Sequence, residues 1–244
     1  MKSINKTPTT GFTRFELLVI LFVTVGLTAI ALPVLGATSA RSRLAQCFNN
    51  LREIGRASQA WASEKNDFPW LIPRADGGLN NRDGQIPFAA NPFIHFSFMS
   101  NELVSPRLLV CPSDTVKKVA KDFSSNLDGG FLGLAYQNNA LSYLVGFHGS
   151  VTLPREILSG DRTMRTTVNE HCSVVGVPAS ALVPGDSSIM WTNLHSKTGH
   201  LLFSDTSVEN LSSAQLRKTI ADSSGNTAAP THIQIPGLPA SILE

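Results

Sequence analysis

The sequence predicts an α+β protein that begins with one long helix, and three features of the chain lead to this class. The first is an uncharged apolar run, Leu17 to Leu35. The second is a one-sided helical pattern that continues the run to about Glu64. The third is a series of short strand candidates beyond Asn66, separated by turns rich in glycine, proline, asparagine and aspartate.

The apolar run Leu17 to Leu35 is long enough to cross a bilayer once. At about 1.5 Å per residue it gives roughly 28 Å of helix. The residues ahead of it carry Lys2 and Lys6 and no acid, which favours a cytoplasmic amino terminus and export of the chain beyond the run. An alternative is a secretory signal cut after Ala29 to Ala31, which reads Ala-Ile-Ala and would release a soluble protein. That alternative leaves Glu16 unexplained.

Glu16 is a carboxylate at the mouth of this apolar run. An ionisable group at such a position is costly unless it is paired, so it is a functional candidate. The sequence Gly11-Phe12-Thr13-Arg14-Phe15-Glu16-Leu17-Leu18-Val19-Ile20 resembles the prepilin cleavage and methylation motif of type IV pilins and type II secretion pseudopilins. The resemblance implies that residues 1–11 are a leader peptide. A prepilin peptidase/methyltransferase would cut after Gly11 and methylate Phe12.

The resemblance also implies that residues 12–35 form a transmembrane and assembly helix. In that family the glutamate at the position of Glu16 pairs with the terminal amine of a neighbouring subunit. In low dielectric such a pair can set register, although desolvation offsets much of the gain. Pro33 falls where many pilins carry a helix-interrupting proline. Arg14 departs from the family, which usually has leucine there, and its long stem can reach the cytoplasmic interface.

Residues 36–65 form the amphipathic second half of the predicted helix. Its apolar positions recur at helical spacing, which is typical of a core-facing stripe. They are Leu44, Cys47, Phe48, Leu51, Ile54 and Trp61. Pilin-like proteins lay a sheet against this half of the helix, so the resemblance implies a pilin-like α+β domain over residues 66–220, with an antiparallel β-sheet and loop-rich insertions.

Within that domain the strand signals are short. We expect a strand or buried turn at 93–99, strands at 140–147 and 187–192, and a weaker one at 174–177. A hairpin is expected at 200–204 and 207–210 around Asp205-Thr206, followed by a helix from Ser212, as N-cap, through Ile220. Residues 221–244 are small, polar and proline-bearing, and we expect a loose tail.

Three further segments sharpen the resemblance, because similar ones recur in one large bacterial branch of prepilin-like proteins. They are Cys47 to Gly55, Leu109 to Asp114, and a C-terminal motif in which nine residues separate His195 from Asp205. The branch has glycine after this aspartate, whereas this chain has Thr206. Glycine tolerates a positive φ in a hairpin turn and threonine does so poorly, so the turn type is open.

His195 and Asp205 admit two interpretations. They could be catalytic or metal-binding, with other histidines recruited to complete the site. Zinc sites, however, usually show close ligand pairs at regular spacing, and the nearest pair here, His195 and His200, is five residues apart on an expected loop. We therefore favour a structural role, in which Asp205 caps the turn through its own backbone and His195 anchors the preceding loop. No metal or cofactor is predicted.

The chain has three cysteines, and export would place them in an oxidising compartment. At most one intramolecular bridge can form. Cys47 with Cys111 comes first because each lies in a segment of the resemblance. The other pairings with Cys172, and buried free thiols, stay open.

Composition and motifs exclude several function classes. With 20 basic and 18 acidic residues, the net charge of +2 gives no field that favours nucleic acid. A P-loop, a dinucleotide-binding motif and a nucleophile elbow are all missing from the sequence, so no enzyme is predicted.

The expected function is therefore that of a structural subunit, a pseudopilin or minor pilin, of a type II secretion or type IV pilus-like filament. Its expected partners are the prepilin peptidase/methyltransferase, other pilin-like subunits and the inner membrane. The expected location is single-pass in that membrane, with a cytoplasmic amino terminus and a periplasmic or extracellular domain. The alternative is a membrane-anchored periplasmic binding or enzymatic domain that uses the prepilin export route without polymerising.

Overall fold

The computed structural model describes residues 11, 13–80, 91–172, 177–192, 194–195, 197–223 and 230–237. Within these ranges the side chains of 29–38, 169–172, 177–178 and 223 are not described. The chain forms two compact units, residues 1–42 and residues 43–244. The boundary lies within the segment 36–65, so most of the predicted second half of the helix belongs with the larger unit.

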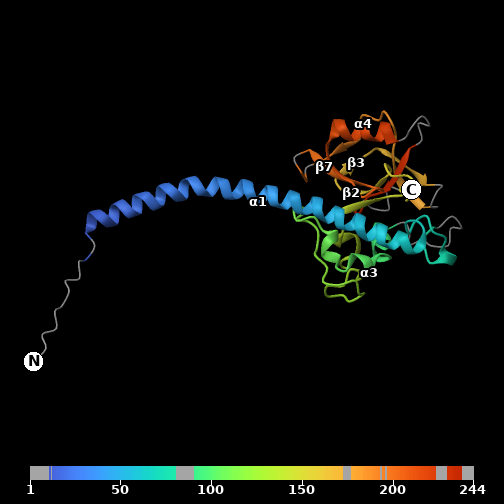
Figure 1. Ribbon diagram of the computed structural model, residues 1–244, viewed down its shortest axis with the longest axis horizontal. Helices are drawn as coiled ribbons and strands as arrows, with labels where there is room; N and C mark the ends of the chain where they lie inside the picture. Colours follow the sequence, from blue (N-terminus) through green and yellow to red (C-terminus); the bar gives the residue numbers. More distant parts are fainter. Residues whose placement is uncertain are drawn as a thin grey trace, which may run out of the picture. The chain divides into compact units, whose positions relative to one another are not determined.

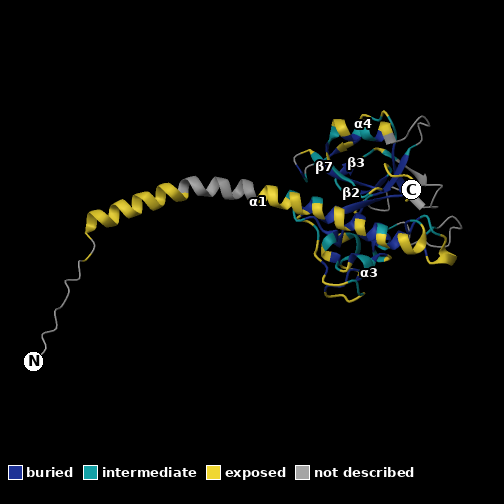
Figure 2. Cartoon of the chain, in the orientation of Figure 1, coloured by how far each residue is buried: buried dark blue, intermediate teal, exposed yellow. Residues whose placement is uncertain are grey.

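The helix α1 (Arg14–Lys65) has 52 residues and contributes to both units. Its helical backbone continues through Pro33, the predicted kink, whose side chain lies outside the described part. In the smaller unit the described apolar side chains are exposed at almost every position, as the colouring of Figure 2 shows. These side chains, from 15 to 27, are called here the exposed apolar segment: Phe15, Leu17, Leu18, Val19, Ile20, Leu21, Phe22, Val23, Val25 and Leu27.

The prediction of a membrane-spanning first half is wrong for this structure. Among the described residues, no helix is long and apolar enough to cross a membrane.

The larger unit contains a seven-stranded sheet in which all neighbouring pairs are antiparallel. The order is β4-β5-β9-β1-β2-β7-β8. The strands are β1 (Tyr143–Gly146), β2 (Ile157–Asp161), β4 (Val168–Cys172), β5 (Val177–Leu182), β7 (Thr198–Phe203), β8 (Val208–Ser212) and β9 (Thr231–Gln234). A separate two-stranded sheet pairs β3 (Met164–Arg165) with β6 (Met190–Trp191).

Short helices complete this unit. The α-helices are α2 (Pro92–Ser97), α3 (Ser100–Leu103) and α4 (Ser213–Ser223). The 3-10 helices are η1 (Arg74–Asp76), η3 (Pro106–Leu109) and η4 (Gln137–Ala140).

The sheet is covered on both faces, and adjacent residues of its strands point to opposite sides. On one face the end of α1, with Leu51 and Ile54, shares a core with Val145, Leu158 and Leu202. On the other face α4 packs on the sheet, and Figure 1 shows α1 and α4 on opposite sides of the strands. This second core includes Leu144, Ile157, Leu201, Phe203, Leu216, Ile220 and Ile233. The central strands are therefore fully buried.

Gly55 allows α1 to lie close to β7 and the turn that follows it. A Cβ at this position would lie 2.9 Å from Cδ1 of Leu202 and 3.4 Å from Cβ of Thr206. The glycine in the Cys47 to Gly55 segment thus has a packing explanation, since a larger side chain would push the helix from the sheet.

The segment 93–99, expected as a strand or buried turn, is mostly the helix α2. Pro92 occupies the first turn, where its fixed φ suits a helix and its missing N–H costs nothing. The aromatic residues that suggested a strand are buried on this helix, with Phe93 and Phe96 in the main core. The strand expected at 187–192 is also shorter than predicted, since β6 covers Met190–Trp191 alone. Most of the candidate at 174–177 lies outside the described residues.

The prediction of a loose tail over 221–244 is wrong for residues 231–234. They form β9, which lies between β5 and β1 in the middle of the sheet. Ile233 is fully buried. Without a strand at this place the sheet would be interrupted between β5 and β1. The sequence Thr-His-Ile-Gln, which lies between two prolines, has the alternating pattern of a strand and occupies this position.

The hairpin and helix expected from residue 200 onward are confirmed. β7 and β8 pair around the turn, and α4 comes directly after them. Ser212 and Gln215 form a capping box, in which the Ser212 backbone N–H and hydroxyl donate to Oε1 of Gln215 at 2.9 and 2.8 Å. The Gln215 N–H donates back to the serine hydroxyl at 3.4 Å.

Thr206 has a φ of +68° in this turn, a conformation that favours glycine. Replacing Thr206 with glycine should therefore raise the free energy of unfolding by about 1 kcal/mol, since relief of strain exceeds the added entropy of the unfolded chain. Denaturant unfolding measures this change. Thr206→Ala is the control, because alanine keeps the Cβ and should not stabilise. A stabilisation equal in both variants would show that threonine side-chain packing, not φ, is the cause.

Candidate functional site

The first candidate site is the start of α1, where Thr13 and Glu16 form a capping box. The Thr13 backbone N–H and hydroxyl each donate to Oε2 of Glu16 at 2.8 Å. The Glu16 N–H donates to the Thr13 hydroxyl at 3.2 Å. These bonds from Thr13, the backbone one first, lower the pKa of the exposed Glu16 carboxyl. The sequence pattern Thr-x-x-Glu before an apolar run indicates such a capping box, but the sequence analysis does not include it.

Glu16 therefore has a partner in its own chain. Among the described residues both bonds go to Oε2, and Oε1 is available to a second donor. Gly11 is exposed, and a Cβ built on it would meet nothing within 4 Å. Phe12, the predicted methylation site, lies outside the described residues. The structure thus describes Gly11 and Glu16 of the predicted processing and assembly site.

The second candidate site is a buried cluster that brings together the other three segments of the sequence analysis. Cys47 of α1 forms a disulfide bond with Cys111, the pairing that the sequence analysis placed first, with Cα atoms 4.9 Å apart. Beside it, Nδ2 of Asn50 donates to the carbonyl of Val110 at 3.1 Å. The Tyr143 hydroxyl donates to the Cys47 carbonyl at 3.5 Å. These contacts attach the helix to the domain.

Asp114, at the end of the second segment, ties the same region to Arg162, the residue that directly follows β2. Its two carboxylate oxygens accept from Nε and Nη2 of Arg162 at 2.6 and 2.8 Å. The Ser142 hydroxyl adds a third bond at 2.9 Å. Burial alone would raise the pKa of the Asp114 carboxyl, but the hydrogen bonds and charge of Arg162 outweigh it and lower the pKa. The carboxylate is therefore charged and fully paired near neutral pH.

His195, the start of the C-terminal motif, lies against both the disulfide and a buried carboxylate. Its Nε2 is 3.5 Å from Sγ of Cys111 and 3.4 Å from Oδ2 of Asp161. The same Oδ2 accepts from the His200 backbone N–H at 2.8 Å and lies 3.0 Å from Nδ1 of that histidine. We call Asp161, His195 and His200 the Asp161 cluster. All three are buried.

The expectation that His195 anchors its loop stays a prediction; its described side-chain neighbours are Asp161, His200 and Cys111. Asp205 is exposed and caps the hairpin turn, where its Oδ1 accepts from the Ser207 N–H at 2.9 Å. The sequence analysis missed Asp161, because the pairing of β2 with β7 brings it beside His200 and no local pattern signals that pairing. Burial lowers the pKa of His195, although the Asp161 carboxylate opposes this, so the neutral imidazole is favoured.

A second pair of histidines lies elsewhere in the larger unit. Nε2 of His148 is 2.9 Å from Nδ1 of His232 on β9. Burial and then the neighbouring ring lower the pKa of His148 to about 4. The two rings therefore share a hydrogen bond with His148 uncharged near neutral pH.

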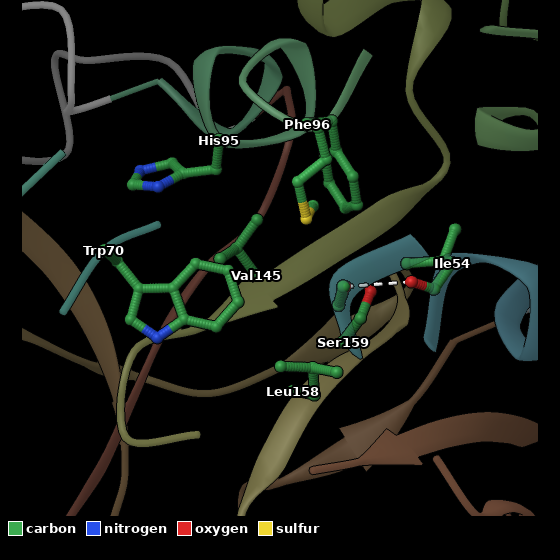
Figure 3. A pocket seen from close by; sticks show the side chains of 9 residues that line it. Ile54, Trp70, His95, Phe96, Val145, Leu158 and Ser159 are labelled. Atoms are coloured by element: carbon green, nitrogen blue, oxygen red, sulfur yellow. Dashed lines mark hydrogen bonds between the residues drawn. The ribbon is translucent and has the colours of Figure 1, made fainter. Parts of the chain in front are cut away.

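A small cavity, shown in Figure 3, lies between α1, α2 and strands β1 and β2. Its volume is about 10 Å³, which is room for one water molecule at most. The rings of Trp70 and Phe96 and the side chain of Val145 surround it (Figure 3). The hydroxyls of Ser58 and Ser159 donate to backbone carbonyls at 2.8 and 2.7 Å. The cavity is therefore better explained by imperfect packing than by a polar ligand.

Comparison of the chain with protein-family models, with curated proteins and with solved structures gives no match. None of these comparisons therefore supports the pilin-like designation of the fold.

The disulfide between Cys47 and Cys111 should stabilise the larger unit strongly. Replacing both cysteines with alanine should lower the free energy of unfolding by about 2 to 4 kcal/mol, because the bond closes a long loop in the unfolded chain. Denaturant unfolding with and without a dithiol reductant measures this. The reductant should shift the unmodified chain by a similar amount and leave the double variant unchanged. A shift in the double variant would assign the effect to something other than this bond.

The folded domain should lose stability between about pH 6.5 and pH 4 because of His148. Its folded pKa of about 4 lies below the ordinary 6.5, so the unfolded chain binds more protons in this window and acidification favours unfolding. His148→Gln should reduce this loss by about 1 to 2 kcal/mol, after allowance for solvent screening of a half-buried ring. Denaturant unfolding at several pH values measures it. His232→Gln should have a smaller effect, since burial is the larger cause; an unchanged pH profile in His148→Gln would contradict the assignment.

Proposed function

We propose that this chain is a structural subunit, a pseudopilin or minor pilin, of a type II secretion or type IV pilus-like filament. It is processed after Gly11 by a prepilin peptidase/methyltransferase and assembles through α1 with other subunits. The observation that carries the proposal is the start of α1, which combines an oriented carboxylate with the exposed apolar segment. The sequence motif from Gly11 to Ile20 supports the same assignment.

The exposed apolar segment requires a partner. Phe15 is 75% exposed and Phe22 is 82% exposed, and burying a side chain of this kind contributes about 1.5 to 3 kcal/mol. Apolar positions follow one another along the chain, so they point to all sides of the helix. A helix that is apolar all round is normally surrounded by other elements, and a single groove would cover one side alone. Several copies of α1, packed around one another in a filament, would cover every side.

Two threonines, one within this segment and one directly after it, do not oppose such packing. The Thr24 hydroxyl donates to the carbonyls of Ile20 and Leu21 at 3.0 and 2.9 Å. The Thr28 hydroxyl donates to those of Thr24 and Val25 at 3.0 and 2.9 Å. Both hydroxyls are therefore satisfied within the helix and can be buried by a neighbour at little cost.

Glu16 supplies the directional part of the assembly. After cleavage the terminal amine of a neighbouring chain carries a positive charge, which methylation retains, and it can donate to Oε1 while Thr13 keeps Oε2. At the edge of an apolar interface, desolvation offsets the free energy gained from this ion pair. Its main effect is therefore to fix how far neighbouring helices are shifted along one another.

The larger unit suits a role outside the cytoplasm. A buried disulfide bond is typical of an oxidising compartment, which supports export of residues 43–244. The disulfide, together with the Asn50 and Tyr143 hydrogen bonds, holds the end of α1 on the sheet. A helix that joins a filament would in this way carry the domain with it. No catalytic constellation enters the proposal.

Glu16→Gln should abolish assembly while leaving the helix start intact, because glutamine can accept the same bonds from Thr13 but carries no charge. Assembly is measured by disulfide cross-linking between copies that carry Phe22→Cys, and by recovery of sheared filaments. Thr13→Ala is the matched control: it removes the cap, keeps the charge and should retain most cross-linking. A cysteine at Val116, which is 74% exposed in the larger unit, controls for random collision.

Two results would overturn the proposal. Cross-linking of Glu16→Gln at the level of the unmodified chain would show that the charge plays no part. A mature chain that starts at Met1 in cells with an active prepilin peptidase, measured by the mass of the amino-terminal peptide, would remove the processing step. A mature chain starting at methylated Phe12 is the expected result.

A further inference from the structure

We propose that the Asp161 cluster binds a divalent transition-metal ion of the zinc class. This inference is independent of the filament proposal and concerns the core of the larger unit. Its basis is the convergence of one carboxylate and two imidazoles whose ligand atoms all lie within 4.8 Å of one another.

The distances within the cluster fit a metal site. Ligands bound at about 2.0 to 2.2 Å in tetrahedral geometry lie about 3.3 to 3.6 Å from one another. Nε2 of His195 is 3.4 Å from Oδ2 of Asp161, and Nδ1 of His200 is 3.0 Å from the same oxygen. The ligand atoms of the two imidazoles lie within 4.8 Å of each other, so binding an ion requires a movement of the rings.

Hydrogen bonding alone leaves polar atoms of the cluster poorly satisfied. Oδ1 of Asp161 is buried and has no hydrogen-bond partner among the described residues. The side chain of His195 is 1% exposed, and the described neighbours of its Nε2 are a carboxylate oxygen at 3.4 Å and a disulfide sulfur at 3.5 Å. The distance to the oxygen is long for a strong hydrogen bond, and a disulfide sulfur is a weak acceptor. Buried polar groups of this kind are normally paired, and a metal ion would use the lone pairs of both residues.

The surroundings hold the three ligands in place. The His200 backbone N–H donates to Asp161, which fixes the carboxylate against β7. The Thr198 N–H and hydroxyl donate to the His195 carbonyl at 3.0 and 2.7 Å, which fixes the backbone that carries this imidazole. Supporting bonds of this kind orient metal ligands.

The charge of the region also suits a cation. Asp114 is paired with Arg162, so its carboxylate is already neutralised. The described charged or ionisable side chains within 4 Å of the Asp161 carboxylate are the imidazoles of His195 and His200. A divalent ion would therefore meet one negative charge that has no fixed cation beside it among the described residues.

The disulfide decides which ligands are present. Cys47, Cys111 and His195 form a second group with suitable spacing, but zinc binds thiolates, and both sulfurs are bonded to each other. In the disulfide-bonded protein the site is therefore Asp161, His195 and His200. Binding through the cysteines requires a two-electron reduction by a dithiol, and it is a different site.

The test is titration of the disulfide-bonded full chain, purified without reductant in a mild detergent and stripped with a chelator, with Co²⁺. We expect visible absorption bands of a tetrahedral ion that saturate at one Co²⁺ per chain and disappear when Zn²⁺ is added. His195→Gln and His200→Gln should each weaken binding by more than about 100-fold. His148→Gln is the matched control, since it removes a half-buried histidine elsewhere in the same unit, and it should bind as the unmodified chain does.

Cadmium NMR of the unmodified chain keeps the test decisive if a histidine variant fails to fold. A chemical shift typical of nitrogen and oxygen ligands is expected. The proposal is overturned by an absence of saturable binding, by full binding in the folded His195 and His200 variants, or by binding that appears after reduction alone, which would assign the metal to Cys47 and Cys111.

Discussion

The disulfide between Cys47 and Cys111 is the constraint on which the arrangement of the larger unit depends. It joins a helix to a segment that is distant in the sequence, and beyond the end of α1 the described residues between them form only short helices joined by loops. Such loops carry a large conformational entropy in the unfolded chain. Closing them covalently reduces that entropy, and Asn50 and Tyr143 then add hydrogen bonds at the same point. The disulfide and the two hydrogen bonds therefore hold the helix on the sheet at a point where the connecting chain contributes little regular structure.

Both faces of the sheet are covered because adjacent residues of a strand point to opposite faces, and each helix packs on one of these faces. Leu144 and Leu201 face α4, whereas Val145 and Leu202 face α1. The close approach of α1 at Gly55 belongs to the same arrangement, since Leu202 is the residue that a larger side chain would strike. The buried Asp161 cluster lies beside this interface, next to the disulfide.

Local signals in the sequence predicted the elements whose causes are local. The turn at Asp205 and the cap at Ser212 depend on side chains that bond their own backbone within a few residues, so the pattern alone is sufficient. Asp161 and β9 depend on strand pairing across long stretches of chain, for which a single sequence carries no signal. The aromatic run at α2 misled the prediction because aromatic residues favour strands on average, whereas Pro92 fixed a helical start. At the start of α1, Glu16 was identified, but its partner Thr13 was missed.

Because of the exposed apolar segment, the helicity of the smaller unit should depend on the concentration of the molecules that pack against it. An isolated helix in water is marginal, and most helical stability comes from packing of its apolar face. The larger unit has its own core and should hold its structure at any dilution. In the segment from Phe15 to Leu27, by contrast, the packing must come from other molecules, so its helicity should rise with the local concentration of partners. One chain therefore combines a unit with a fixed stability and a unit whose stability depends on how many copies surround it.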